Sequence, residues 1–140
     1  MRKMLFILSL ISLYLTVSCS HDTSINVNDA VGKSEDYFRK VEGIAATASS
    51  FDGNKDVKFR LMVEGNLTEA EATILFKRIL DATAKFSNHS DVWDYYNGYF
   101  DIMNYDHGVI YEGTKRIGED LKSNRSEISI PLAIWIYIFG

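Results

Sequence analysis

Four carboxylates are the residues of this sequence best suited to acid–base chemistry. Asp91, Asp94 and Asp101 lie within an aromatic-rich stretch, and Glu112 would face them if the chain turned back in a hairpin. Glycosidases use two carboxylates in this way, one as the acid and one as the base or nucleophile. The sequence contains 19 acidic residues, however, so chance neighbours are common. A solvated acidic face is therefore the stronger interpretation.

Other catalytic and cofactor-binding patterns are absent from the sequence. The three histidines, His21, His89 and His107, have no His, Asp or Glu partner at the spacing that metal ligands take on a helix. The sequence contains no Gly-x-Ser-x-Gly nucleophile motif and no glycine-rich phosphate-binding motif. We therefore predict a protein that is not an enzyme and that uses no metal and no cofactor.

Aromatic side chains are concentrated between Trp93 and Tyr105. A strand with so many aromatic side chains cannot bury every ring against one face, so some Tyr and Trp side chains should stay exposed. Exposed Tyr and Trp are enriched where proteins bind proteins. The sequence therefore predicts a protein-binding surface with the candidates Trp93, Tyr95, Tyr99 and Tyr111.

Residues 1–18 have the layout of an export signal. Arg2 and Lys3 give a positive start, residues 4–15 are mainly apolar, and short side chains follow. The apolar part falls short of the roughly 20 residues that a membrane-spanning helix needs. Cys19 comes next and is the only cysteine in the sequence, so the chain cannot form an internal disulfide. We predict that residues 1–18 are a signal peptide.

Residues 15–19, Leu-Thr-Val-Ser-Cys, resemble the lipobox of bacterial lipoproteins. Ser18 matches the small residue expected before the cysteine, whereas Leu15 lies one position early and Thr16 takes the place usually held by leucine. The resemblance implies a diacylglyceryl thioether on Cys19, cleavage before it, and anchoring at the outer face of the cytoplasmic membrane. The alternative is an ordinary cleaved signal with an unrelated cysteine beside the cut.

Charge constrains the partners of the remaining chain. Loss of Arg2 and Lys3 lowers the 15 basic residues to 13, against 19 acidic ones, which gives residues 19–140 a formal charge of −6. An acidic surface disfavours nucleic acid and anionic lipid headgroups, so membrane contact would depend on the lipid. Residues 19–32 are mostly polar and weakly patterned, which predicts a flexible tether between lipid and domain.

Two stretches have the clearest secondary-structure patterns. Residues 57–64 alternate between apolar and mainly polar side chains, which is typical of a half-buried strand. Residues 68–86 begin with a capping box, in which Thr68 and Glu71 each bond the other's backbone, and apolar residues then recur at helical spacing. We predict a strand followed by the longest helix of the domain.

Weaker patterns complete the predicted fold. A helix capped by Ser34 is expected at residues 33–41. Three more strands are expected at residues 44–51, 91–103 and 109–114, with turns at residues 52–56 and 104–108. Helical spacing also runs from Ile110 to Leu121, although Gly113 and Gly118 weigh against a helix there. The prediction is an α+β domain over residues 33–122, with an antiparallel sheet of about four strands and one long helix packed on it.

Residues 123–140 form a tail that becomes almost wholly apolar. Its most apolar part, residues 132–139, is too short to span a bilayer. The tail could be a final strand of the sheet, a segment that dips into the membrane interface, or an ending produced by an altered reading frame. The first interpretation is the simplest, because an exposed apolar strand would promote aggregation.

Three parts of the chain resemble small lipoproteins of Bacillus and its relatives, some of which mobile elements carry. They are the lipobox region, FRLMVEGNLTE at residues 59–69 and DVWDYYNGYF at residues 91–100. The resemblance covers residues 1–122 and leaves the tail unmatched. It implies an exclusion protein, which recognises a component of an incoming conjugation machine and blocks redundant transfer. No residue role carries over, because the matching stretches contain no diagnostic motif.

We therefore expect a membrane-anchored extracytoplasmic lipoprotein that acts through a membrane or surface protein partner. Two other classes stay open. One is an envelope enzyme that acts on wall carbohydrate through Asp94 or Asp101. The other is a small-ligand-binding lipoprotein, for which a domain of this size offers little room for two closing lobes.

Overall fold

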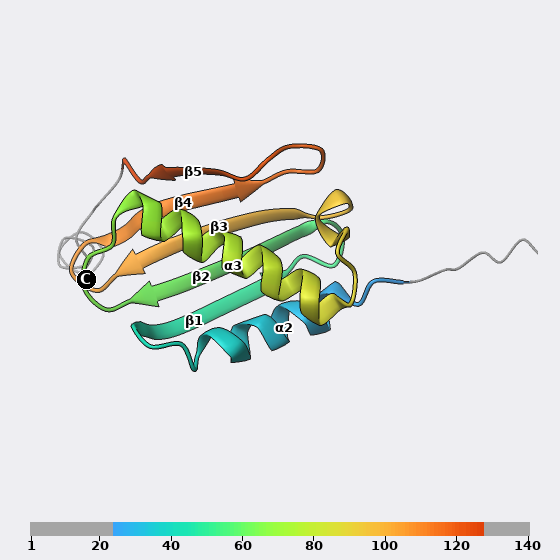
Figure 1. Ribbon diagram of the computed structural model, residues 1–140, viewed down its shortest axis with the longest axis horizontal. Helices are drawn as coiled ribbons and strands as arrows, with labels where there is room; N and C mark the ends of the chain where they lie inside the picture. The colour runs from blue at the N-terminus through green and yellow to red at the C-terminus, as the bar shows by residue number, and fades with distance from the viewer. Residues whose placement is uncertain (1–23, 128–140) are drawn as a thin grey trace, which may run out of the picture.

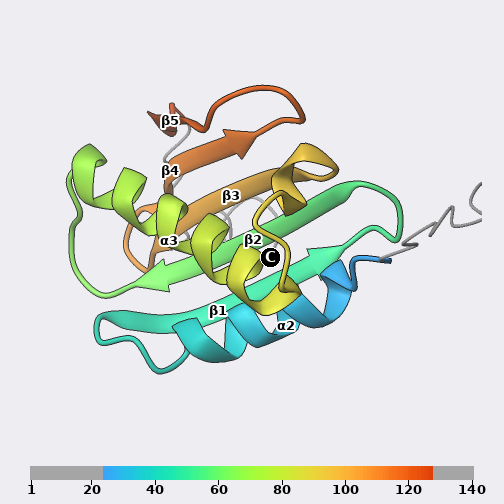
Figure 2. The ribbon, with the colours of Figure 1, turned by 45° about the vertical axis from the view of Figure 1, so that its right-hand side comes forward.

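The structure, a computed structural model, describes residues 24–127. They form a sheet with two helices packed on one face (Figures 1 and 2), which confirms the predicted α+β class with a long helix on a mainly antiparallel sheet. The predicted signal peptide, the predicted lipidation site at Cys19 and tail residues 128–140 lie outside the described residues. The elements in chain order are α2 (Val27–Phe38), β1 (Ile44–Phe51), β2 (Asp56–Val63), α3 (Glu69–Ser87), η1 (Val92–Asp94), β3 (Asn97–Asn104), β4 (Gly108–Lys115) and β5 (Lys122–Arg125).

The five strands lie in the sheet in chain order, from β1 at one edge to β5 at the other. Neighbouring strands are antiparallel except for β2 and β3, which run parallel. They run parallel because α3 returns the chain from the end of β2 to the start of β3 (Figure 1). The structure thus adds a fifth strand and one parallel pair to the predicted sheet, and it packs the predicted first helix, α2, beside α3.

Helix α3 begins where the capping box predicted. The Thr68 hydroxyl accepts the N–H of Glu71, and the Glu71 carboxylate accepts the backbone N–H of Thr68 at 2.7 Å. The backbone and hydroxyl bonds from Thr68 lower the pKa of Glu71, because they favour its ionised form. The helix ends at Ser87, and the C-cap residue Asn88 has a left-handed φ of 58°, a conformation that asparagine tolerates.

Helix α2 begins earlier than predicted, which corrects the proposed tether and helix start. Asn26 caps the helix by accepting the N–H of Asp29 at 3.1 Å. Residues 27–32 are therefore helical rather than part of a flexible tether, because they continue a buried stripe that runs to Phe38. Ser34, the predicted cap, lies inside this stripe, where its hydroxyl donates to the Ala30 carbonyl at 2.8 Å. The polar residue within the stripe explains why the pattern understated the helix.

The sequence predicts a single strand over the aromatic residues 91–103, but the structure divides this stretch into two elements. The chain first forms the short 3-10 turn η1, and β3 begins at Asn97. The reason is the burial of Trp93 beside α3, where its indole N–H donates to the Leu80 carbonyl at 3.0 Å. The hairpin that follows agrees with the prediction, since β3 ends at Asn104 and Gly108 opens β4 with a φ of 71°.

The sheet continues past residue 122, the predicted end of the domain. Strand β5 pairs antiparallel with β4, so residues 123–125 belong to the sheet rather than to an apolar tail. Pairing with β5 gives hydrogen-bond partners to backbone N–H and C=O groups of β4 that would otherwise lie unpaired at the edge of the sheet. Strand β4 also excludes the helical alternative over residues 110–115.

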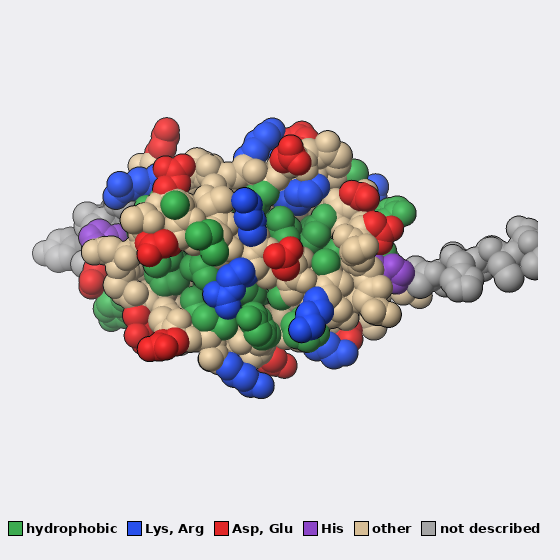
Figure 3. Space-filling view, in the orientation of Figure 1, with side chains coloured by type: hydrophobic (Ala, Val, Ile, Leu, Met, Phe, Trp, Pro, Cys, Tyr) green, Lys and Arg blue, Asp and Glu red, His purple; other side chains and the backbone are tan. Residues whose placement is uncertain are grey.

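The core fills the space between the helices and the helix-facing side of the sheet. Phe76 of α3 stacks against Phe100 of β3 with ring centroids 6.0 Å apart, and Trp93 meets Phe100 edge-on. Gly113 of β4 leaves room for Phe76, since a Cβ at this position would lie 2.8 Å from the ring. Some hydrophobic side chains remain visible on the helix side of the molecule, over α3 and toward β1 (Figure 3).

Candidate functional site

The face of the sheet opposite the helices carries a broad hollow of about 930 Å³. Period-two alternation directs every second side chain of each strand onto this face. In residues 24–127 neither helix covers it, because α2 and α3 both pack on the other side (Figures 1 and 2). We call this surface the open face and define it by the side chains of Ala48, Ser50, Lys58, Arg60, Tyr99, Asp101, Glu112, Thr114 and Asn124.

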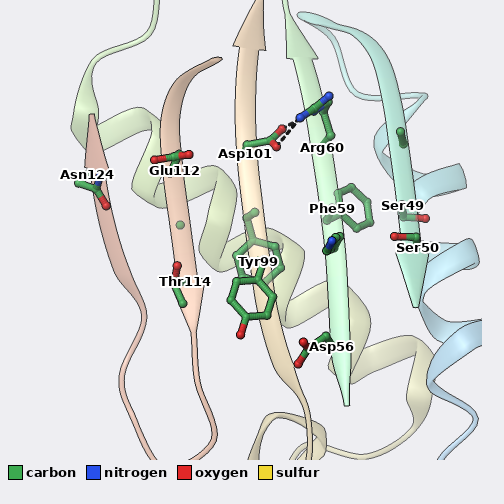
Figure 4. A pocket seen from close by; sticks show the side chains of 14 residues that line it. Ser49, Ser50, Asp56, Phe59, Arg60, Tyr99, Asp101, Glu112, Thr114 and Asn124 are labelled. Atoms are coloured by element: carbon green, nitrogen blue, oxygen red, sulfur yellow. Dashed lines mark hydrogen bonds and ion pairs between the residues drawn. The ribbon is translucent and has the colours of Figure 1, made fainter. Parts of the chain in front are cut away.

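An ion pair between β2 and β3 occupies the centre of the open face (Figure 4). Arg60 and Asp101 are register partners, and the guanidinium donates from Nε to Oδ1 at 2.6 Å and from Nη2 to Oδ2 at 2.8 Å. The hydrogen bonds to Asp101 raise the pKa of Arg60. A two-pronged contact of this kind fixes the direction of both side chains. It therefore provides a preformed charge pattern.

Two further charged side chains lie next to the central pair, one along β2 and one across the sheet on β4. Lys58 lies one pleat before Arg60 on β2, opposite Tyr99, and Glu112 on β4 is the register partner of Asp101. Among the described residues neither Lys58 nor Glu112 forms an ion pair. Within residues 24–127, the open face therefore presents an unpaired cation on the β2 side and an unpaired anion on the β4 side.

Of the four carboxylates singled out in the sequence, the fold brings two together. Asp101 and Glu112 lie side by side on β3 and β4, as the hairpin prediction required. Asp91 directly precedes η1 and Asp94 is its last residue, so both lie before β3, and neither lines the hollow. Both carboxylate oxygens of Asp101 accept hydrogen bonds from Arg60. Arg60 therefore occupies both oxygens of the carboxylate that an acid–base role for Asp101 would need.

The predicted aromatic surface does not form, because two of its members are buried. Trp93 is 7% exposed beside α3, and Tyr111 is also 7% exposed on the helix-facing side of β4. The Tyr111 hydroxyl donates to the Leu67 carbonyl at 2.8 Å, so its polar end is satisfied inside the protein. The sequence could not show this, because the strand alternation on β4 depends on its register with β3.

The other two predicted aromatic residues are accessible but belong to different places. Tyr99 lies on the open face (Figure 4), whereas Tyr95 is 55% exposed in the turn after η1. Lys58 and Arg60 were not singled out as site residues, although the alternation of residues 57–64 assigned them to the polar side. Their positions opposite Tyr99 and Asp101 follow from the parallel pairing of β2 with β3, which no local pattern reports.

The described histidines do not assemble a metal site. The His89 Nδ1 lies 3.8 Å from the Asp91 carboxylate, and His107 is exposed in the turn between β3 and β4. Within residues 24–127, no group of three or more His, Cys, Asp or Glu side chains is arranged to hold a metal ion. His21 lies outside the described residues.

Comparison with known proteins identifies no similar protein. No protein-family model, no curated protein and no solved structure matches the chain. Neither α2 nor α3, the two helices within residues 24–127, combines the length and apolar character needed to cross a membrane. Any functional inference therefore rests on the sequence motifs and on the geometry of the described domain.

Proposed function

We propose that this protein is a lipoprotein, anchored through Cys19 on the extracytoplasmic side of the membrane, that acts by binding another protein through its open face. The export-signal pattern and the resemblance of residues 15–19 to a lipobox support the anchor. A short polar stretch before α2 would hold the domain close to the bilayer. The partner is then a membrane or surface protein within reach of that tether.

The observation that carries this proposal is the fixed charge pattern on the open face. Arg60 and Asp101 hold each other in place, and in the described part of the chain neither Lys58 on β2 nor Glu112 on β4 forms an ion pair. Complementary charges on a partner would fix its orientation and speed its association. The hollow is open to solvent along the sheet rather than enclosed, whereas small-molecule sites bury most of their ligand.

The resemblance to lipoproteins of mobile elements suggests the biological role. A protein of this kind on a recipient cell would recognise a component of an incoming conjugation machine and block redundant transfer. An immunity role linked to a mobile element uses the same physical features. Both roles need the domain outside the cytoplasmic membrane and a surface that selects one partner.

A conjugation assay with charge-reversal variants tests the proposal. Recipient cells that express the full chain should accept a related conjugative element less often than cells without it. The double variant Lys58→Glu/Glu112→Lys keeps the net charge but inverts the open face, and should restore transfer. The matched control is Asp29→Lys/Lys33→Glu, which inverts an exposed ion pair on α2. Equal exclusion by all three proteins would remove the open face from the mechanism.

The anchor is tested separately by replacing Cys19. The Cys19→Ala variant should no longer incorporate labelled fatty acid, and it should leave the membrane fraction. Retention in the membrane with unchanged processing would contradict lipid anchoring, and this result would not depend on whether the open face binds a partner. Exclusion should also be lost in this variant, because the domain would no longer be held beside its partner.

A further inference from the structure

A second surface feature lies on the helix side, away from the open face. It is an apolar hollow of about 260 Å³ where the turn between α2 and β1 meets the turn between β2 and α3. We define the apolar hollow by its lining residues Val41, Ile44, Val63, Leu67, Ile74 and Leu75. The backbone N–H of Glu64 donates to the Gly43 carbonyl at 2.9 Å, which ties the two turns together. The walls of the hollow are therefore held in place.

Ile74 extends the apolar hollow onto the outer surface of α3. Its side chain is 57% exposed, although it sits beside apolar walls on the first half of α3. Figure 3 shows hydrophobic side chains gathered over α3 and toward β1 on this side. A docking partner that covered this aliphatic side chain and the apolar hollow beside it would remove apolar surface from water, which favours binding.

The rim of the apolar hollow is acidic. Glu42, Glu64 and Glu71 line it, and the bonds from Thr68 hold Glu71 in its ionised form. Among the described residues Glu42 and Glu64 form no ion pair. Arg78 is the one basic residue of the lining, and it donates to the Tyr37 hydroxyl at 3.2 Å with its guanidinium over the Phe38 ring. The rim keeps a net negative charge.

We infer that the apolar hollow is a docking site for a partner-protein segment that inserts one large apolar side chain flanked by lysine or arginine. The volume falls below the range of about 300–1,000 Å³ typical of small-molecule sites, so a single side chain is the better fit. The acidic rim selects basic neighbours for that side chain by charge complementarity. This docking site lies on the opposite side of the sheet from the open face, and it does not depend on the function proposed there.

Short labelled peptides test the inference on the purified full chain. The probe is Lys-Lys-Leu-Lys-Lys, and the comparison peptides are Glu-Glu-Leu-Glu-Glu and Lys-Lys-Ser-Lys-Lys, measured by fluorescence anisotropy. We expect the probe to bind at least about tenfold more tightly than either comparison peptide, a difference of about 1.4 kcal/mol. Equal binding of the serine peptide would overturn the inference, because the protein would then attract any cation.

Matched variants separate the apolar hollow from the overall acidic charge. Glu42→Lys/Glu64→Lys should weaken probe binding by about tenfold, the scale of losing two complementary rim charges. Asp94→Lys/Asp120→Lys changes two exposed acids on other parts of the surface by the same amount and should leave binding nearly unchanged. Ile74→Ser should weaken binding without unfolding the domain, since this side chain is largely exposed. Similar losses in both charge variants would refute a local site.

Two further arms give outcomes that do not depend on the proposed function. The open-face variant Lys58→Glu/Glu112→Lys should bind the probe as the unchanged protein does, so the two surfaces can fail separately. A chain that ends at residue 127 should also bind the probe with unchanged affinity. If the probe bound this shortened chain but not the full chain, residues 128–140 would be the occupant, and the inference of a partner would be wrong.

Discussion

The two sides of the sheet use neighbouring residues of the same strand for opposite purposes. On β2, Phe59 and Leu61 are almost completely buried against the helices, whereas Lys58 and Arg60 point to the open face. The helix side gains stability from close packing of apolar atoms. The open face gains little from its ion pair, because half of the Arg60 side chain remains in water. Neighbouring residues of β2 therefore differ in role, since one packs in the core and the next meets solvent.

The largest expected difference between the two sides comes from truncating adjacent residues of β2. Phe59→Ala should destabilise the domain by about 3–5 kcal/mol, because it leaves a cavity in the core. Lys58→Ala should change the free energy of unfolding by less than about 0.5 kcal/mol, as is usual for exposed positions. Urea unfolding of both variants measures the contrast. Comparable losses at the two positions would mean that the open face is covered in solution.

Adding a methyl group to the core side should have the next largest effect. Gly113→Ala places a Cβ 2.8 Å from the buried Phe76 ring, so we expect a loss of about 1–3 kcal/mol. Gly32→Ala is the matched control, because no atom lies within 4 Å of its Cβ and the position is helical. There alanine should raise stability by about 0.5–1 kcal/mol. A neutral Gly113→Ala would show that Phe76 can move aside.

The central ion pair of the open face should contribute less. A double-mutant cycle of Arg60→Ala and Asp101→Ala should give a coupling free energy of about 0.2–1 kcal/mol, decreasing as salt is added. The same variants should weaken partner binding far more than they weaken folding. A coupling well above this range would indicate that the pair stabilises the fold itself.

The smallest effect concerns the exposed capping box at the start of α3. The folded-state pKa of Glu71 lies below its ordinary value of 4.5, so its stabilising contribution is complete above that pH and is lost as pH falls through the folded pKa. Glu71→Gln keeps the side-chain shape and removes the charge. The variant should be slightly less stable at neutral pH, and the gap should close in acid. Thermal unfolding across this range measures it, and a gap independent of pH would contradict the assignment.

Local patterns predicted the parts of the domain that depend on near neighbours in the chain. The capping box at Thr68, the alternation over residues 57–64 and the turn after β1 all agree with the structure. In that turn Asp52 accepts the N–H groups of Asn54 and Lys55, a contact within a few residues. The helix at α2 was understated because the buried Ser34 resembles a cap, and its true role depends on packing against α3.

The candidate site could be predicted only in part, for a physical reason. The sequence identified Asp101, Glu112 and Tyr99 as residues of interest, and the hairpin between β3 and β4 keeps them close along the chain. Arg60 is 41 residues from Asp101, and the crossover through α3 is what brings them together. The burial of Trp93 and Tyr111 is likewise a consequence of which face meets the helices.

The amino-acid sequence by itself determined the α+β class, the long capped helix and the polarity of each side of β2, because these depend on periods of two or about 3.6 residues. Tertiary structure decided the parallel pairing of β2 with β3, the fifth strand and the grouping of charges on the open face. Those features arise from contacts between residues far apart in the chain. Such contacts depend on how the helices cover the sheet, which no short stretch of sequence specifies.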